Sequence, residues 1–81
     1  MTLAEAPLRG RVVLRHVGGE RAFRRRLMEM GLVPGTEVSL INVAPLGDPL
    51  ELHVRGSRLS IRAAEANLVT VEALGSSAGA A

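Results

Sequence analysis

The sequence contains no cysteine, tryptophan or tyrosine, and Phe23 is its only aromatic residue. Without cysteine the chain can form neither disulfide bonds nor thiolate metal sites, which fits a reducing compartment. Proline-rich peptides bind in grooves lined by aromatic side chains, and single-stranded nucleic acids stack on such side chains. We therefore expect neither of these binding modes, and we expect a core built from aliphatic side chains.

Long hydrophobic runs are also missing. The uninterrupted apolar runs are only a few residues long, whereas a helix that spans a bilayer needs roughly 20. The first seven residues lack the basic start and the apolar stretch of a signal peptide. These absences predict a soluble, cytoplasmic protein.

The sequence is sufficient for one small folded domain. Its 81 residues leave no room for a second core, and 47% of them are hydrophobic. We expect residues 1–9 to pack on the domain or lead into it, and residues 10–74 to form it. The small residues 75–81 have nothing to bury and are predicted to be a disordered tail.

All ten basic residues are arginines, and they are unevenly distributed. The stretch 9–26 holds seven of them and a single acid, Glu20, whereas the rest of the chain is acidic overall. Because the planar guanidinium group binds carboxylates and phosphates well, this stretch suits an acidic or phosphate-bearing partner. A general compositional preference for arginine would produce the same excess, so both interpretations stay open.

Alternating apolar and polar residues predict five short strands, at 10–17, 36–43, 50–55, 58–62 and 67–72. The pattern shifts at Leu40 and Ile41, which predicts a bulge. Gly56 and Ser57 are expected to form a two-residue hairpin turn of the primed type. The residues expected to point inward are Val12, Leu14, Val38, Leu40, Leu50, Leu52, Val54, Leu59 and Ile61.

A short helix is predicted at 20–30, and a single helical turn at 63–66. At 100° per residue, Phe23, Leu27 and Met30 form a narrow apolar stripe along the first of these helices. The opposite face, which we expect to be exposed, carries Arg21, Arg24, Arg25 and Met28.

Two clusters of turn-forming residues bracket the second strand. Gly31 is placed to cap the helix, and Pro34 with Gly35 suits the centre of a type II turn. The loop 44–49 is expected to be stiff because Pro45 and Pro49 fix their φ angles. The residues that shape the two clusters are Gly31, Pro34, Gly35, Pro45, Gly47 and Pro49. Five short strands, tight turns and one inserted helix predict a small antiparallel barrel, with an open α+β meander as the alternative.

The order and spacing of several segments resemble the FeoA family. These segments are Arg26-Leu-Met-Glu-Met-Gly-Leu-Val-Pro-Gly35, Ala44-Pro-Leu-Gly-Asp-Pro49, Leu59-Ser-Ile-Arg62, Glu65-Ala66 and Val69-Thr-Val71. The resemblance covers roughly residues 10–72 and implies a mainly β, SH3-like, five-stranded barrel. It also implies a small cytoplasmic accessory protein of bacterial ferrous iron uptake, whose partner is the membrane permease FeoB with its GTPase domain. Fe²⁺ would be the transported ion of the pathway, and no tightly bound cofactor is expected.

A related domain ends the iron-dependent repressors of the diphtheria toxin repressor type. The sequence shows no DNA-binding or dimerisation segment ahead of the barrel, which favours the stand-alone protein. A basic nucleic-acid-binding module is the competing interpretation, with phosphate contacts from the arginines of the helix. Weak self-association is left open.

The two predicted partner-binding surfaces are the exposed helix face and the stiff loop. Arginine and methionine are enriched at protein interfaces, and a preordered loop loses little entropy on binding. A purely solvated helix face and a purely structural corner are the alternatives. The residues predicted to contact a partner are Arg21, Arg24, Arg25, Met28, Leu46 and Asp48.

Neither catalysis nor a metal site is expected. The glycine pairs lack the lysine and the spacing of a phosphate-binding loop, and so small a core leaves little room for a catalytic pocket. His16 and His53 are the only imidazoles, and no His-x-x-x-His or Glu-x-x-His spacing occurs. His16 is expected to align with the inward residues of the first strand. A weak site that combines His53 with Asp48 or Glu51 is the only metal-binding arrangement left open.

Overall fold

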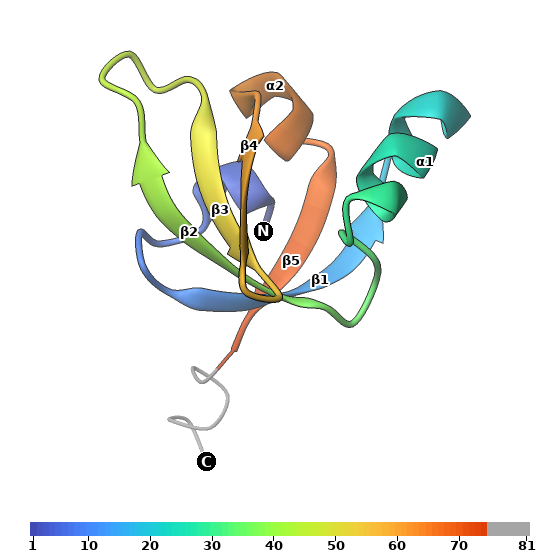
Figure 1. Ribbon diagram of the computed structural model, residues 1–81, viewed down its shortest axis with the longest axis horizontal. Helices are drawn as coiled ribbons and strands as arrows, with labels where there is room; N and C mark the ends of the chain where they lie inside the picture. The colour runs from blue at the N-terminus through green and yellow to red at the C-terminus, as the bar shows by residue number, and fades with distance from the viewer. Residues whose placement is uncertain (75–81) are drawn as a thin grey trace.

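Five antiparallel strands form one curved sheet in the order β4-β3-β2-β1-β5, which confirms the predicted mainly β barrel (Figure 1). The computed structural model describes residues 1–74. Its strands are β1 (Arg11–Val17), β2 (Glu37–Val43), β3 (Leu50–Val54), β4 (Ser57–Ile61) and β5 (Val69–Ala73). The helical elements are η1 (Leu3–Glu5), α1 (Arg21–Glu29) and α2 (Ala63–Ala66). The tail predicted to be disordered, 75–81, lies outside the described residues.

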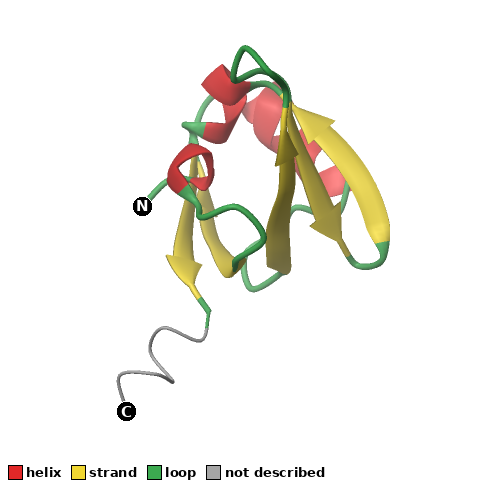
Figure 2. Ribbon diagram, turned by 90° about the vertical axis from the view of Figure 1, so that its left-hand side faces the viewer, coloured by secondary structure: helices red, strands yellow, loops and turns green. Residues whose placement is uncertain are grey.

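The core lies between two groups of strands that face one another (Figure 2). Alternate side chains of a strand point to opposite faces, so the apolar residue at every second position enters the interior. All the residues predicted to point inward are buried, except Leu59, which is half-buried. Leu3, Leu27 and Leu32 fill the remaining space and are also inaccessible to solvent.

Bulges in β1 and β2 set the direction of the side chains that follow them. The register with β3 shifts between Leu40 and Asn42, as the sequence pattern predicts. A second shift, in the pairing of β1 with β5, lies between Leu14 and His16. The expectation that His16 aligns with the inward residues is therefore wrong, because the extra residue turns its exposed side chain away from the core.

Helix α1 is held to the barrel by its predicted apolar stripe and by the way it ends. Leu27 is fully buried, whereas Met28 on the opposite face is 58% exposed. Gly31 has φ of 97°, as expected for a residue that ends a helix in the left-handed conformation. The backbone N–H of Leu32 then donates to the carbonyl of Leu27 at 2.9 Å, which completes a Schellman motif and directs Leu32 into the core.

The β3–β4 hairpin differs from its prediction by one position. The turn residues are Arg55 and Gly56, with φ of 52° and 80°, and Val54 pairs with Ser57. Positive φ at both central residues is the geometry of a type I′ turn, so the primed type is right but the predicted pair, Gly56 and Ser57, is wrong. Pairing of Leu52 with Leu59 keeps the apolar residues of both strands on one face.

The N-terminal segment runs along the last strand and then turns into β1. Leu3 is fully buried, Thr2 bridges to Thr70, and the N–H of Val71 donates to the carbonyl of Met1 at 2.8 Å. Leu8 bridges to Leu40 of β2, and its side chain is 56% exposed. No helix in residues 1–74 has the length and apolar character needed to cross a bilayer.

Candidate protein-docking site

One hollow of about 480 Å³ gathers all four residues predicted on the exposed helix face. It lies between α1, the end of β1 and the segment that follows the helix. Its lining residues are His16, Val17, Arg21, Arg24, Arg25, Met28, Leu32 and Pro34. The hollow combines cationic side chains with an apolar floor, which is a suitable composition for binding another protein.

Helical spacing explains why these side chains share one face. Residues three and four positions apart lie one above the other on a helix, so Arg21, Arg24 or Arg25, and Met28 form one row. Leu27 anchors the helix on its opposite side, and this anchoring keeps the row turned outward. The polarizable thioether of Met28 adapts to differently shaped apolar partners.

The arginines of the hollow and the neighbouring Arg26 differ in their ion pairing. Within residues 1–74, Arg21, Arg24 and Arg25 form no ion pair. Arg26 pairs with Glu65 of α2, and its guanidinium carbon lies 5.6 Å from the centre of the Phe23 ring. The helix thus uses one arginine to hold its place and presents the other three to solvent.

Glu65 of α2 binds both the residue before its own helix, Arg62, and Arg26 of α1. Its carboxylate accepts a hydrogen bond from the backbone N–H of Arg62 at 3.1 Å, which closes the start of α2, and also binds Arg26. The Arg62 N–H lowers the pKa of Glu65 below its usual value. Partial burial opposes this lowering of the pKa, and the hydrogen bond and charge of Arg26 reinforce it.

Sequence reasoning missed His16, Val17, Leu32 and Pro34 as parts of the hollow. The bulge in β1 brings His16 to it, and the Schellman motif places Leu32 beneath it. The bulge shows in the apolar pattern only as a change of spacing, with Leu14 and Val17 three positions apart. Gly31 does signal the turn after the helix, and a hydrophobic residue directly after such a glycine commonly packs back on the helix.

The stiff loop is a separate feature that does not line this hollow. The N–H of Ala44 donates to the carbonyl of Pro49 at 3.1 Å, and Gly47 has φ of 86°. Leu46 at its tip is 96% exposed. Asp48 points back to the protein: its carboxylate accepts the backbone N–H of Ala63 at 3.0 Å. The loop therefore presents Leu46, while Asp48 fixes the loop to α2.

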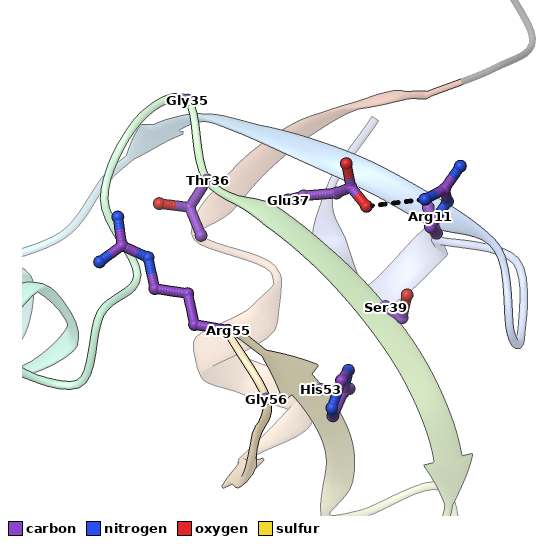
Figure 3. A pocket seen from close by; sticks show the side chains of 8 residues that line it. All are labelled: Arg11, Gly35, Thr36, Glu37, Ser39, His53, Arg55 and Gly56. Carbon is purple, nitrogen blue, oxygen red and sulfur yellow. Dashed lines mark hydrogen bonds and ion pairs between the residues drawn. The ribbon is translucent and has the colours of Figure 1, made fainter.

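Two of the three candidate metal ligands, Glu51 and His53, line one hollow together with Asn42 and Arg58. No three His, Cys, Asp or Glu side chains of the described part of the chain lie close enough together to hold a metal ion. His53 lines a polar hollow of about 590 Å³ beside Ser39, where Arg11 pairs with Glu37 at 3.1 Å (Figure 3). The Glu51 carboxylate accepts the Asn42 side-chain N–H at 3.1 Å, and Asp48 is bound to α2.

A five-stranded antiparallel barrel with a helix inserted between its first two strands defines a small SH3-like domain, and its candidate site is an open hollow on that helix. The protein-family model of the FeoA domain matches residues 1–73 of the sequence. The chain therefore belongs to the FeoA family, which is found in ferrous iron transport.

Two solved structures show how similar the barrels are. FeoA of Chlorobium tepidum is 42% identical, with a TM-score of 0.87, over 91% of this chain and 70% of that protein. FeoA of Stenotrophomonas maltophilia, described as a prokaryotic SH3 domain protein and solved with zinc, is 37% identical. The similarity covers 89% of both chains with a TM-score of 0.74.

A longer relative carries the same domain joined to a transporter. The fusion of Fe(2+) transport protein A with the Fe(2+) transporter FeoB in Porphyromonas gingivalis is 33% identical over 78 residues. The match covers 96% of this chain and 9% of the fusion protein, so the chain spans less than a tenth of that relative.

Proposed function

We propose that this protein is a cytoplasmic accessory protein of bacterial ferrous iron uptake, which docks on the inner side of an FeoB-type permease and modulates its assembly or activity. The observation that carries the proposal is the P. gingivalis fusion, in which a similar domain and FeoB are one polypeptide. A covalent link keeps two modules at high effective concentration. Domains joined in this way in one organism are good candidates for non-covalent partners in another.

The hollow on α1 is the proposed contact surface. Three arginines without ion pairs in the described part of the chain line the hollow with Met28, so an acidic partner surface with an apolar side chain at its centre would match it. Leu46, presented on a braced loop, is the second proposed contact, and a contact through Asp48 stays a prediction. This role requires no catalysis by the chain. GTP hydrolysis would belong to the partner, and Fe²⁺ would be its cargo.

A double substitution tests the docking surface. Arg25→Glu with Met28→Asp reverses one charge and places a carboxylate in the apolar centre of the hollow. We expect the amount of permease recovered at a given protein concentration to fall at least about tenfold, which corresponds to about 1.4 kcal/mol of binding free energy. The thermal unfolding midpoint should change little because both side chains are exposed.

Leu8→Asp with Arg9→Glu is the matched control. Leu8 and Met28 are almost equally exposed, at 56% and 58%, and both double variants change the net charge by the same amount. Equal recovery of permease by the helix variant and the wild-type protein would exclude the hollow as the docking site. Equal loss in both variants would show that the loss is not specific to the hollow on α1, since Arg9 lines another hollow together with Arg58. A salt-sensitive gel shift with generic DNA or RNA, abolished by the helix variant, would favour nucleic-acid binding instead.

A further inference from the structure

The two edges of the sheet are protected differently. At the β5 edge, the chain's own N-terminal segment supplies backbone partners, through Thr2 beside Thr70 and Met1 bonded to Val71. At the β4 edge, the strand pairs with β3 on one side, and no other segment within residues 1–74 pairs with it on the other (Figure 1). One edge is therefore covered and the other is free.

The hairpin geometry identifies the free backbone groups. A two-residue turn closes on a hydrogen-bonded pair, here Val54 and Ser57, and hydrogen-bonded pairs then alternate along an antiparallel ladder. The backbone N–H and C=O groups of Leu59 and Ile61 consequently form hydrogen bonds with β3. The N–H and C=O groups of Arg58 and Ser60 point away from the sheet, where an extended segment could pair with them.

The side chains of β4 define the chemistry of such a segment. Arg58 is exposed on the outer face and has no ion pair in the part of the chain that the structure describes. Leu59 is half-buried on the inner face and packs against the core. No acidic residue lies on β4, and the turn before it carries Arg55, a second cation without an ion pair within residues 1–74. An added strand would therefore place an acidic side chain beside Arg58 and an aliphatic one beside Leu59.

The strand also lacks two of the features that usually prevent such pairing, a bulge and a proline. Its register with β3 runs without a bulge, and its five residues include no proline. Natural sheets block free edges with bulges, prolines, charged side chains or covering segments, and the one charged side chain of β4, Arg58, would repel cationic strands but not acidic ones.

We propose that the β4 edge binds an extended acidic and aliphatic segment of the partner by strand addition. The identity of that partner as the permease rests on the proposed function. The backbone of Arg58 and Ser60 would supply the hydrogen bonds, and the side chains of Arg58 and Leu59 would select the sequence. The β4 edge would act in addition to the hollow on α1.

A peptide titration tests the edge without the permease. Blocked seven-residue peptides with alternating valine and glutamate, or valine and lysine, are added to the ¹⁵N-labelled protein at millimolar concentration. We expect the amide signals of Arg58 and Ser60 to shift with the glutamate peptide, and at least threefold less with the lysine peptide. No shift in β4, or equal shifts with both peptides, would overturn the proposal. Shifts that depend only on protein concentration would assign the edge to a second copy of the chain.

Ser60→Pro is the matched blocking variant. The Ser60 N–H points away from β3, so proline removes a donor for the added strand without removing a hydrogen bond of the ladder. We expect Ser60→Pro to abolish the peptide-induced shifts and to reduce permease recovery several-fold, whereas Ser60→Ala keeps both.

If the wild-type protein binds the peptide but not the permease, the proposed function fails and the edge site stands. If it binds the permease but not the peptide, the edge proposal fails. If Ser60→Pro does not fold, hydrogen exchange of the Arg58 and Ser60 amides in the wild-type protein, with and without peptide, decides instead.

Discussion

The carboxylate of Asp48 lies 3.0 Å from the backbone nitrogen of Ala63 and accepts its hydrogen bond. Asp48 belongs to the loop between β2 and β3, and Ala63 is the first residue of α2. A side chain remote in sequence thus performs the task that a capping residue usually performs locally, since the first N–H groups of a helix have no partner within the helix. The stiff loop is consequently fixed at its base, and Leu46 projects from it.

Removal of this acceptor should weaken the fold by a predictable amount. We expect Asp48→Ala to lower the free energy of unfolding by about 1 kcal/mol, the usual cost of losing a helix cap. Asp48→Asn keeps an oxygen acceptor and should recover most of that loss. Urea denaturation of the three proteins measures the difference. Equal destabilisation by alanine and asparagine would show that the hydrogen bond to Ala63 is not the reason.

The lowered pKa of Glu65 predicts an acid-dependent stability. A carboxyl group whose pKa is lower in the folded state stabilises the fold above its unfolded pKa, near 4.5. That contribution is lost as the pH falls through the lower folded pKa. Glu65→Gln should therefore destabilise the protein at neutral pH and have a smaller effect at pH values well below 4.5.

Urea midpoints at neutral and acidic pH measure this dependence. Glu29→Gln is the control, because Glu29 forms no ion pair within residues 1–74. A destabilisation by Glu65→Gln that stays constant over this pH range would contradict the assignment of the stabilisation to the charged carboxylate.

The hairpin turn offers a stabilising substitution. Arg55 has φ of 52° at the first central position of a type I′ turn, where asparagine followed by glycine is the favoured pair. Arg55→Asn should raise the free energy of unfolding by about 0.5 kcal/mol, since asparagine tolerates the left-handed conformation better. Arg55→Val should lower it, because a branched side chain is strained there. Thermal melts that rank valine at or above asparagine would refute the turn assignment.

Much of the fold could be predicted because the relevant signals are local. Alternation of apolar residues identifies the strands, and Gly31 marks the end of α1. The hairpin turn was misplaced because Arg55 adopts a conformation that its residue type does not suggest. The apolar pattern does not decide between the two turns, because a turn at Gly56 and Ser57 would pair Val54 with Leu59 and keep the same face inward.

The candidate site could be predicted only where it depends on a single helix. The 100° spacing placed Arg21 and Met28 together, whereas His16 reached the hollow through a bulge that shows in the sequence only as the three-residue spacing of Leu14 and Val17. Asp48 appeared to be a free loop residue because its partner, Ala63, is a backbone donor 15 positions away. Side chains bound to a distant backbone are invisible to any pattern of residue types.

The segment that covers β5 also limits how many molecules can join through their sheets. Continuous growth from one copy to the next would require the β4 of one molecule to pair with the β5 of another, a head-to-tail contact that repeats into rings or fibres. Met1 and Thr2 already occupy that position along β5. Each molecule can therefore extend its sheet in one direction only, so pairing through β4 ends after a single partner.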